Sequence, residues 1–155
     1  QKERSDSTRQ QIVIAAATCI SRAGFKAATM ASIAKEAGIT WGAIQHHFGT
    51  KEAILDAVLD AGFESTLERF ETKHLAEKSL EHRVAGFLKD YAKTLHSQVY
   101  QANLTIQRNE PELFVKSRKD RMQKEVDELW WTLFGDVKIP KKRMKQKQML
   151  NNKKD

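Results

Sequence analysis

Residues 29–50 read TMASIAKEAGITWGAIQHHFGT, and in this stretch two short apolar segments each follow a threonine and end at a glycine. Thr29 and Thr40 are good helix N-caps, while Gly38 and Gly49 are typical of the residue that ends a helix. The pattern predicts one short helix over residues 30–37 and a second over residues 41–48, joined by a turn at residues 37–39. Two short helices joined in this way have the geometry of a helix-turn-helix.

The second of these helices has a distinctive predicted solvent face. Trp41, Gln45 and His46 point outward, and Gly42 and Ala43 are small enough to allow close approach to another surface. A helix of this size fits the major groove of DNA, where polar side chains near its N-terminus reach base edges. Short helix pairs also occur in many proteins that bind no DNA, so this signal leaves a purely structural role open.

Helix N-termini and basic charge favour an anionic partner for the same region. Thr29, Thr40 and Thr50 each begin a predicted helix, whose N-terminus suits a phosphate, and Lys51 adds a positive charge. The first 51 residues hold seven basic and three acidic side chains, a net charge of +4. A basic module of this kind indicates a nucleic-acid partner, and an ordinary solvated surface is the alternative.

The rest of the chain also has helical periodicity, and no strand pattern, internal repeat or Gly/Ser linker is evident. A first helix carries Ile12 and Ala16 and ends at Gly24. Thr50 caps a long helix that reaches toward Lys73, and Ser79 caps a helix that runs to Leu95. A bend is expected at residues 98–101, then a shorter helix through Leu104 and Ile106. Asn109 and Pro111 are expected to open a last long helix that ends near Phe134, so the predicted fold class is all-α.

Composition excludes several other classes of protein. No apolar run approaches the roughly 18 residues that a membrane span requires, and the polar residues 1–10 contain no signal peptide, so a cytoplasmic location is expected. Cys19 is the one cysteine, so an internal disulfide and a cysteine-based metal site are excluded. The sequence has no glycine-rich phosphate loop, and the adjacent His46 and His47 lie on different helix faces. We therefore expect no enzyme activity, no metal and no cofactor.

The stretch from Gln11 to Leu59 resembles the DNA-binding domain of TetR/AcrR-type transcriptional regulators. The matching segments cover about a third of the chain in register: Ile12-(x)2-Ala15-Ala16, Gly24-Phe25, Thr29-Met30, Ile33-Ala34-(x)2-Ala37-Gly38-Ile39-Thr40, Gly42-Ala43-Ile44 and His47-Phe48-(x)2-Lys51-Glu52-Ala53-Ile54-Leu55. The resemblance implies a helix-turn-helix domain over residues 1–52 and a helical effector-binding and dimerisation domain over residues 53–155, bridged by the fourth helix.

The resemblance also implies a role for each matched position. Thr29, His47 and Lys51 are expected to contact phosphates. The positions that face the groove are Thr40, Trp41, Gly42, Ala43, Gln45 and His46. The family usually has tyrosine where this chain has Gln45, and glutamine pairs bidentately with adenine, so a changed base preference is the more interesting consequence. His47 has an alternative role in supporting the turn between the third and fourth helices.

The C-terminal half holds the candidate effector pocket. Bulky residues and one base are the candidates for its lining: Phe87, Tyr91, Tyr100, Leu104, Arg108, Trp130 and Trp131. A polar effector is expected to meet Arg108 or one of the histidines His74, His82 and His96. Aromatic residues at helical spacing are more often core, so ordinary packing remains the alternative for each of them.

The last segment, from about residue 137, has a separate character. It carries eight of the 27 basic residues and one of the 20 acidic residues, so its net charge is +7 and the rest of the chain is neutral. Family members usually have two further helices that form a dimer interface, and no core-forming helix is predicted after Pro140. The chain is therefore either short or lacks a segment, which leaves the homodimer in question.

The function expected from these features is a one-component repressor. It would bind a palindromic DNA operator and be released by a small-molecule effector, as the family resemblance implies. The alternative is a helical interaction or effector-sequestering protein that has kept the fold and lost sequence-specific DNA binding.

Overall fold

The computed structural model describes residues 2–69, 79–113 and 116–137, and the regular structure within these ranges is entirely helical. The elements in chain order are α1 (Lys2–Ala23), α2 (Met30–Ala37), α3 (Trp41–Phe48), α4 (Lys51–Arg69), α5 (Leu80–Leu95), α6 (Gln98–Asn109), the 3-10 helix η2 (Pro111–Leu113) and α7 (Lys116–Phe134). The predicted all-α fold class is confirmed. The predicted extension of the fourth helix to Lys73 and nearly all of the basic tail lie outside the described residues.

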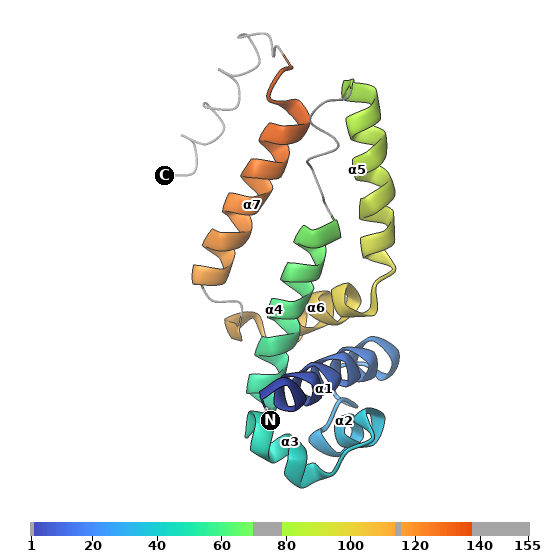
Figure 1. Cartoon of the computed structure of the whole chain (residues 1–155), viewed down its shortest axis with the longest axis vertical. Helices are drawn as coiled ribbons and strands as arrows, with labels where there is room; N and C mark the ends of the chain where they lie inside the picture. The colour runs from blue at the N-terminus through green and yellow to red at the C-terminus, as the bar shows by residue number, and fades with distance from the viewer. Residues whose placement is uncertain (1, 70–78, 114–115, 138–155) are drawn as a thin grey trace.

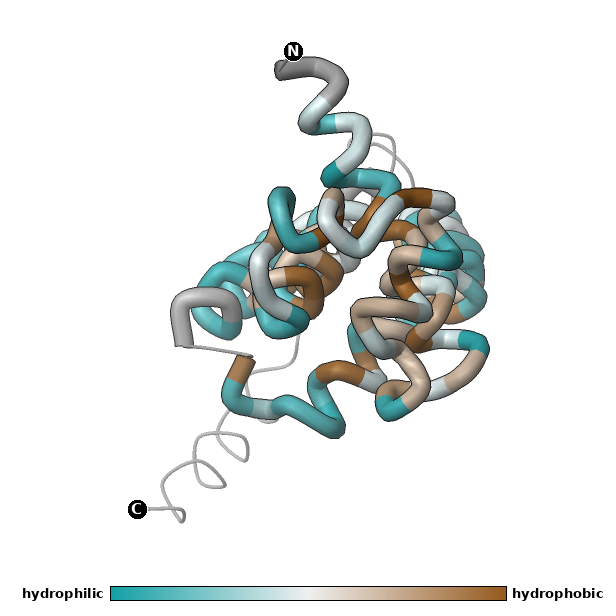
Figure 2. Tube along the Cα trace, turned by 90° about the horizontal axis from the view of Figure 1, so that it is seen from below, coloured by the Kyte–Doolittle hydropathy of each residue, from teal (hydrophilic) through white to brown (hydrophobic). Residues whose placement is uncertain are grey.

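Two groups of helices are visible in Figure 1. Helices α1, α2 and α3 gather at one end with the start of α4, while α5 and α7 stand at the other end with the far part of α4. Helix α6 crosses between the two groups. Apolar and hydrophilic residues alternate along the helices in Figure 2, as amphipathic helices require. In the described part of the chain, no helix is long and apolar enough to cross a membrane.

The predicted helix ends of the N-terminal group are confirmed by their caps. The Thr29 hydroxyl accepts the Ser32 amide at 3.1 Å, and the Ser32 hydroxyl accepts the Thr29 amide at 2.8 Å, which forms a capping box at the start of α2. Gly38 ends α2 with a φ of +64°, a left-handed conformation in which a residue with a Cβ is strained. The chain therefore reverses sharply between α2 and α3.

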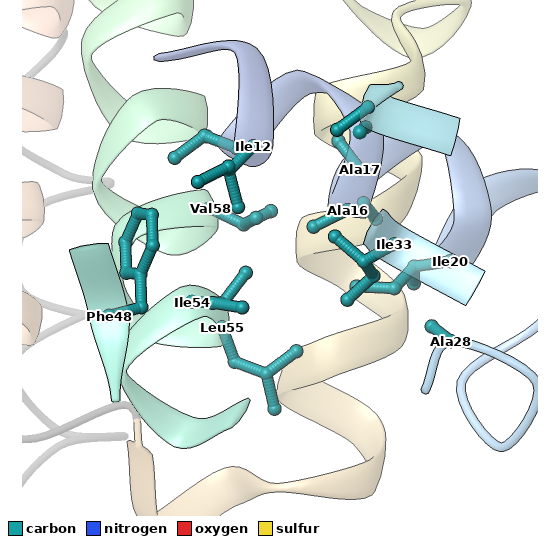
Figure 3. Close-up of a cluster of buried hydrophobic side chains, with 14 of the residues drawn as sticks. Ile12, Ala16, Ala17, Ile20, Ala28, Ile33, Phe48, Ile54, Leu55 and Val58 are labelled. Atoms are coloured by element: carbon teal, nitrogen blue, oxygen red, sulfur yellow. The ribbon is translucent and has the colours of Figure 1, made fainter. Parts of the chain in front are cut away.

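The hydrophobic core lies mainly within the N-terminal group. Ile12 of α1, Ile33 of α2, Ile44 of α3 and Ile54 of α4 are fully buried, and Figure 3 shows Ile12, Ile33 and Ile54 converging within this cluster. Each such side chain stabilises the fold by about 1.5–3 kcal/mol through its removal from water. Helix α1 lies at the centre, because it packs against α2, α4 and α6.

Helix α6 joins this core from the C-terminal half of the sequence. Ala102 and Ile106 are fully buried and belong to the same cluster as the residues of α1 and α4. The N-terminal group is therefore completed by a helix that begins 45 residues after residue 53, where the second domain was predicted to start. That boundary stays a prediction.

One buried arginine links the two helices that stand farthest from this core. Arg83 of α5 is 3% exposed, and its Nε donates to the backbone carbonyl of Leu133 at 2.9 Å. Its guanidinium also pairs with Asp136, just beyond the end of α7. A cation placed at a helix C-terminus interacts favourably with the carbonyl groups exposed there. Arg83 therefore stabilises the contact between α5 and the end of α7.

Two expectations about the second half were wrong. The bend predicted at residues 98–101 lies earlier, at His96 and Ser97, where the Ser97 amide donates to the Thr94 carbonyl at 2.9 Å. Pro111 opens only the three-residue 3-10 helix, and α7 begins at Lys116. Asn109 is the last residue of α6 and not an N-cap, because its side-chain amide donates to the carbonyl one turn earlier in that helix.

Candidate nucleic-acid interface and effector cavity

Helix α3 is placed by its own cap and by two buried side chains. The Thr40 hydroxyl accepts the Ala43 amide at 3.2 Å, and Ile44 and Phe48 anchor the opposite face of the helix in the core. Trp41 is 56% exposed, and Gly42, Gln45 and His46 are exposed as well, as the sequence predicted. Helix α3 therefore presents a free face that combines a large ring, a small residue and two polar side chains.

Ala43 and His47 lie at the edges of this face, and both are half-buried. The rings of His46 and His47 meet edge to face with 5.4 Å between centroids, although the two side chains start from different faces of α3. Among the described residues, no group of three His, Cys, Asp or Glu side chains is placed to hold a metal ion.

The threonines that cap α3 and α4 are exposed and keep a hydrogen-bond donor available. The hydroxyl oxygens of Thr40 and Thr50 each accept a backbone amide at 3.2 Å, from Ala43 and Ala53 respectively. A hydroxyl that accepts one hydrogen bond still has its proton to donate. The start of α3 and the start of α4 therefore both offer a donor and a positive helix end to an anion.

Lys51 contacts Phe25, which could not be predicted from the sequence. Its Nζ lies 3.5 Å from the Phe25 carbonyl oxygen and 4.5 Å from the centroid of the Phe25 ring. The ammonium group has three protons, so these contacts leave it able to meet a phosphate. Lys51 thus joins the connector before α2 to the start of α4.

Two side chains of α1 that the sequence analysis did not single out hold the helix-turn-helix in place. Gln11 Nε2 donates to the Ala37 carbonyl at the end of α2 at 2.7 Å. Arg9 Nη1 donates to the His47 carbonyl at 3.1 Å, and its guanidinium carbon lies 4.1 Å from the centroid of the Phe48 ring. Arg9 therefore neutralises the negative end of α3 and adds an exposed positive charge beside it. The sequence pointed to Arg9 only as one of the seven basic residues among the first 51.

A second candidate site is a cavity of about 570 Å³ between α4, α5, α6 and α7. Five of the seven residues proposed for the lining of an effector pocket line it: Phe87, Tyr91, Tyr100, Leu104 and Trp130. Tyr91 is 39% exposed and Trp130 57% exposed, so these two rings are not core residues in the described chain.

The other candidates for the effector pocket are not part of the described cavity wall. Arg108 and Trp131 do not line the cavity, and Trp131 is 74% exposed on α7. His82 is exposed and pairs with the Ser79 hydroxyl, and His96 is exposed and pairs with the Ala92 carbonyl. His74 lies outside the described residues.

The cavity wall contains polar residues that the sequence analysis missed. Asn103 of α6 lines the cavity and is 8% exposed, and Glu125 of α7 lines it as well. Burial, followed by a hydrogen bond with Tyr91, raises the pKa of Tyr100 above its ordinary value. No sequence pattern distinguishes Asn103 from other asparagines, because its burial depends on how α6 crosses α4.

Comparisons with known proteins agree with this arrangement. The family model for "Bacterial regulatory proteins, tetR family" matches residues 12–58. The chain is 26% identical over 148 residues to the "Uncharacterized HTH-type transcriptional regulator YfiR" of Bacillus subtilis (strain 168), a match that covers 82% of this chain and 69% of YfiR. It is 43% identical over 54 residues to the "HTH-type transcriptional regulator BetI" of Vibrio atlanticus (strain LGP32), which covers 35% of this chain and only 27% of BetI.

A solved structure reported as "Molecular basis for control of antibiotic production by a bacterial hormones" aligns with 79% of this chain and 70% of its own, at 22% identity and a TM-score of 0.48. The likeness to bacterial regulators rests instead on the match over residues 12–58 and on the two regulators. Residues 12–58 therefore match the tetR family of bacterial regulatory proteins, and the chain is similar to helix-turn-helix transcriptional regulators of bacteria.

Proposed function

We propose that this protein is a transcriptional repressor that binds a palindromic DNA operator as a homodimer and is released by a small molecule in the cavity. The observation that carries the proposal is the exposed face of α3, on which Trp41, Gln45 and His46 stand beside the capped N-termini of α3 and α4. Side chains in this position on a recognition helix reach base edges, and the helix ends meet phosphates.

The contacts divide into two kinds. Gln45 and His46 are the proposed base-reading residues, and Trp41, Gly42 and Ala43 form the surface that approaches the groove. Thr29, Thr40, His47 and Lys51 are the proposed phosphate contacts. We add Arg9 to this second group, because its exposed guanidinium lies beside the end of α3. Phosphate contacts fix the position of the protein, whereas base contacts select the sequence.

Helix α4 supports the proposed coupling between cavity and DNA. It begins at Lys51, one residue after the turn that ends α3, and farther along it supplies Leu59, Gly62 and Phe63 to the cavity wall. A ligand with different affinities for two positions of α4 therefore shifts the helix-turn-helix as well. In a dimer, such a shift changes the spacing between the two recognition helices.

Selection of genomic DNA fragments on the purified protein at moderate salt tests the proposal. We expect a palindrome among the retained fragments, whose symmetry reports a dimer and whose half-site spacing locates the two recognition helices. Retention that is unselective and lost at high salt would contradict the operator function, because electrostatic contact alone behaves in that way.

Two substitutions separate the kinds of contact. Lys51→Ala is expected to weaken binding to all DNA sequences and to reduce the slope of log affinity against log salt by about 1. Gln45→Ala is expected to cost about 1–3 kcal/mol on the preferred operator and to relax selection at one base step. Lys89→Ala, an exposed lysine of α5, is the control and should bind like the parent protein. Identical behaviour of the first two variants would refute this division of roles.

A further inference from the structure

The cavity wall is aromatic over much of its area. Six of its side chains have aromatic rings: Phe63, Phe87, Tyr91, Tyr100, Trp130 and Phe134. Phe87 and Tyr91 are stacked nearly parallel with 5.9 Å between centroids, and Trp130 and Phe134 are 4.4 Å apart. Such a wall suits an apolar body, and the negative faces of aromatic rings also attract an ammonium group.

Two hydroxyl groups of the same wall are left as hydrogen-bond acceptors. Thr66 donates its hydroxyl proton to the Gly62 carbonyl at 2.7 Å, and Thr132 donates its own to the Glu128 carbonyl at 2.9 Å. Each hydroxyl oxygen is therefore left with only acceptor capacity. A ligand that carries its own donors can satisfy these two oxygens.

Asn103 provides an acceptor that is buried and has no partner. Its Nδ2 donates to the Leu59 carbonyl at 3.3 Å, and its Oδ1 is buried without a hydrogen-bond partner. The Leu59 carbonyl needs a donor, so the amide cannot be turned over in the free protein without placing two oxygens together. A buried acceptor without a partner is unfavourable, and a donor supplied by a ligand would relieve it.

Close packing explains why Asn103 sits where it does. A Cβ on Gly62 would lie 2.0 Å from Asn103 Nδ2, so only glycine lets the amide rest against α4. In this position Oδ1 is closed to solvent, and a ligand donor reaches it when the amide turns part of the way about its Cβ–Cγ bond, a smaller movement than the full reversal that would place two oxygens together. The long hydrogen bond to Leu59 makes this rotation easier than a short one would.

The charged side chains of the cavity wall indicate the sign of the ligand's charge. The cavity is lined by Glu125 and Glu128, and no lysine, arginine or histidine belongs to its described wall. Glu128 forms an ion pair with Lys124, whose Nζ lies 3.8 Å from the Glu128 carboxylate. Arg121 lies over the Phe63 ring at 4.6 Å, but it pairs with Asp60. Glu125 is half-buried, and no described residue forms an ion pair with it. A cation is therefore favoured over an anion.

From these observations we infer that the cavity takes an amphipathic amine, with an apolar or aromatic body and a protonated nitrogen whose N–H donates to Asn103 Oδ1. This inference rests on the proposed effector function of the same cavity. Glu125 supplies the negative field, and the rings surround the apolar body. Asn103 selects for an N–H donor, which charge alone cannot do.

A series of four compounds with one phenylbutyl body tests each part: 4-phenylbutylamine, 4-phenylbutyltrimethylammonium, 4-phenylbutanol and 4-phenylbutyrate. Calorimetric titration of the full chain should rank the amine first. The trimethylammonium ion keeps the charge but has no donor, and it should bind about tenfold more weakly. The alcohol keeps a donor without the charge and should also bind more weakly than the amine, while the butyrate should bind least.

Two variants assign these differences to residues. Asn103→Leu should weaken the amine about tenfold and leave the trimethylammonium ion unchanged. Glu125→Gln should weaken both cations and leave the alcohol unchanged. Glu81→Gln, at an exposed site on α5, is the matched control. If Asn103→Leu does not fold, the contrast between amine and trimethylammonium ion on the parent protein still decides the question.

Other outcomes would overturn the inference. Tighter binding of the butyrate, equal binding of the two cations, or binding of none of the four compounds each contradicts an amine-selective cavity. The proposed repressor function is judged separately, since retention of operator fragments is measured without any compound. A protein that retains a palindrome but binds the butyrate best would keep its proposed function and lose this ligand class.

Discussion

The two ends of the molecule use apolar residues differently. In the helix-turn-helix end, Ile12, Ile33, Ile44 and Ile54 are fully buried in one cluster. Beyond residue 79, Leu133 is the only described apolar residue outside that cluster that is buried to the same degree. In that region large apolar side chains are exposed instead: Leu80, Leu88, Tyr91, Leu95, Leu104, Met122, Val126, Trp130, Trp131 and Val137.

The helix-turn-helix end is therefore closely packed and rigid, whereas the other end surrounds a cavity. The proposed recognition helix α3 has to hold its side chains at fixed positions against DNA, and close packing provides that. The cavity needs walls that contact a ligand, so rings that a filled core would have buried stand around an opening. The aromatic residues for which ordinary core packing was the alternative line this cavity.

The largest expected effect is a difference in the free energy of unfolding between the same substitution made at each end of the molecule. Leu55, 2% exposed, belongs to the core, whereas Leu88, 56% exposed, lies on α5. Leu55→Ala should lower the free energy of unfolding by about 2–5 kcal/mol. Leu88→Ala, with the same chemical change, should stay within about 0.5 kcal/mol of the parent. Urea unfolding followed by circular dichroism measures both. Equal losses would mean that the second region is packed as tightly as the first.

A smaller effect is expected where the two regions meet. Gly62→Ala places a methyl group against the Asn103 amide at the crossing of α4 and α6. We expect a loss of about 1–3 kcal/mol in the free energy of unfolding, because overpacking forces the helices apart. Urea unfolding checks this value. An unchanged stability would show that the helices separate easily and that the cavity is looser than its wall suggests.

Gly42→Ala is expected to raise stability slightly while it weakens DNA binding. A Cβ at this position meets nothing closer than the Thr40 hydroxyl at 3.9 Å, so the helix should gain up to about 0.5–1 kcal/mol from the better helix former. The same methyl group occupies the face of α3 that approaches DNA. Thermal unfolding and operator affinity should therefore move in opposite directions. Improvement of both would remove Gly42 from the proposed interface.

The smallest effect concerns the reactivity of Cys19 rather than stability. Burial, and then the nearby Glu36, raise the pKa of this thiol, and its Sγ lies 3.7 Å from the Ser32 carbonyl oxygen. A raised pKa leaves less thiolate at pH 8, and the thiolate is the reactive form. Iodoacetamide should therefore alkylate the folded protein more slowly than the urea-unfolded protein at the same pH. Because the chain has a single cysteine, the rate reports this site alone.

Much of the fold could be predicted because its signals are local. Thr29, Thr40 and Thr50 cap the helices they were predicted to cap, and Gly38 ends α2 as expected. The errors near Ser97 and Pro111 arose where local signals compete, since a proline suits both a helix start and a 3-10 turn. The exposed face of α3 was also predictable, because helical periodicity alone determines which residues lie opposite Ile44.

The residues found only in the structure act across long separations in sequence. Arg9 reaches the end of α3, 38 residues later, and Asn103 reaches Leu59, 44 residues earlier. Arg83 reaches Leu133, 50 residues later. Sequence alone determined the helices, their caps and the recognition face, since each depends on neighbours within a few turns. Tertiary structure decided which side chains hold the recognition helix, where the cavity lies and which acceptor is left unpaired, because those depend on how the helices cross.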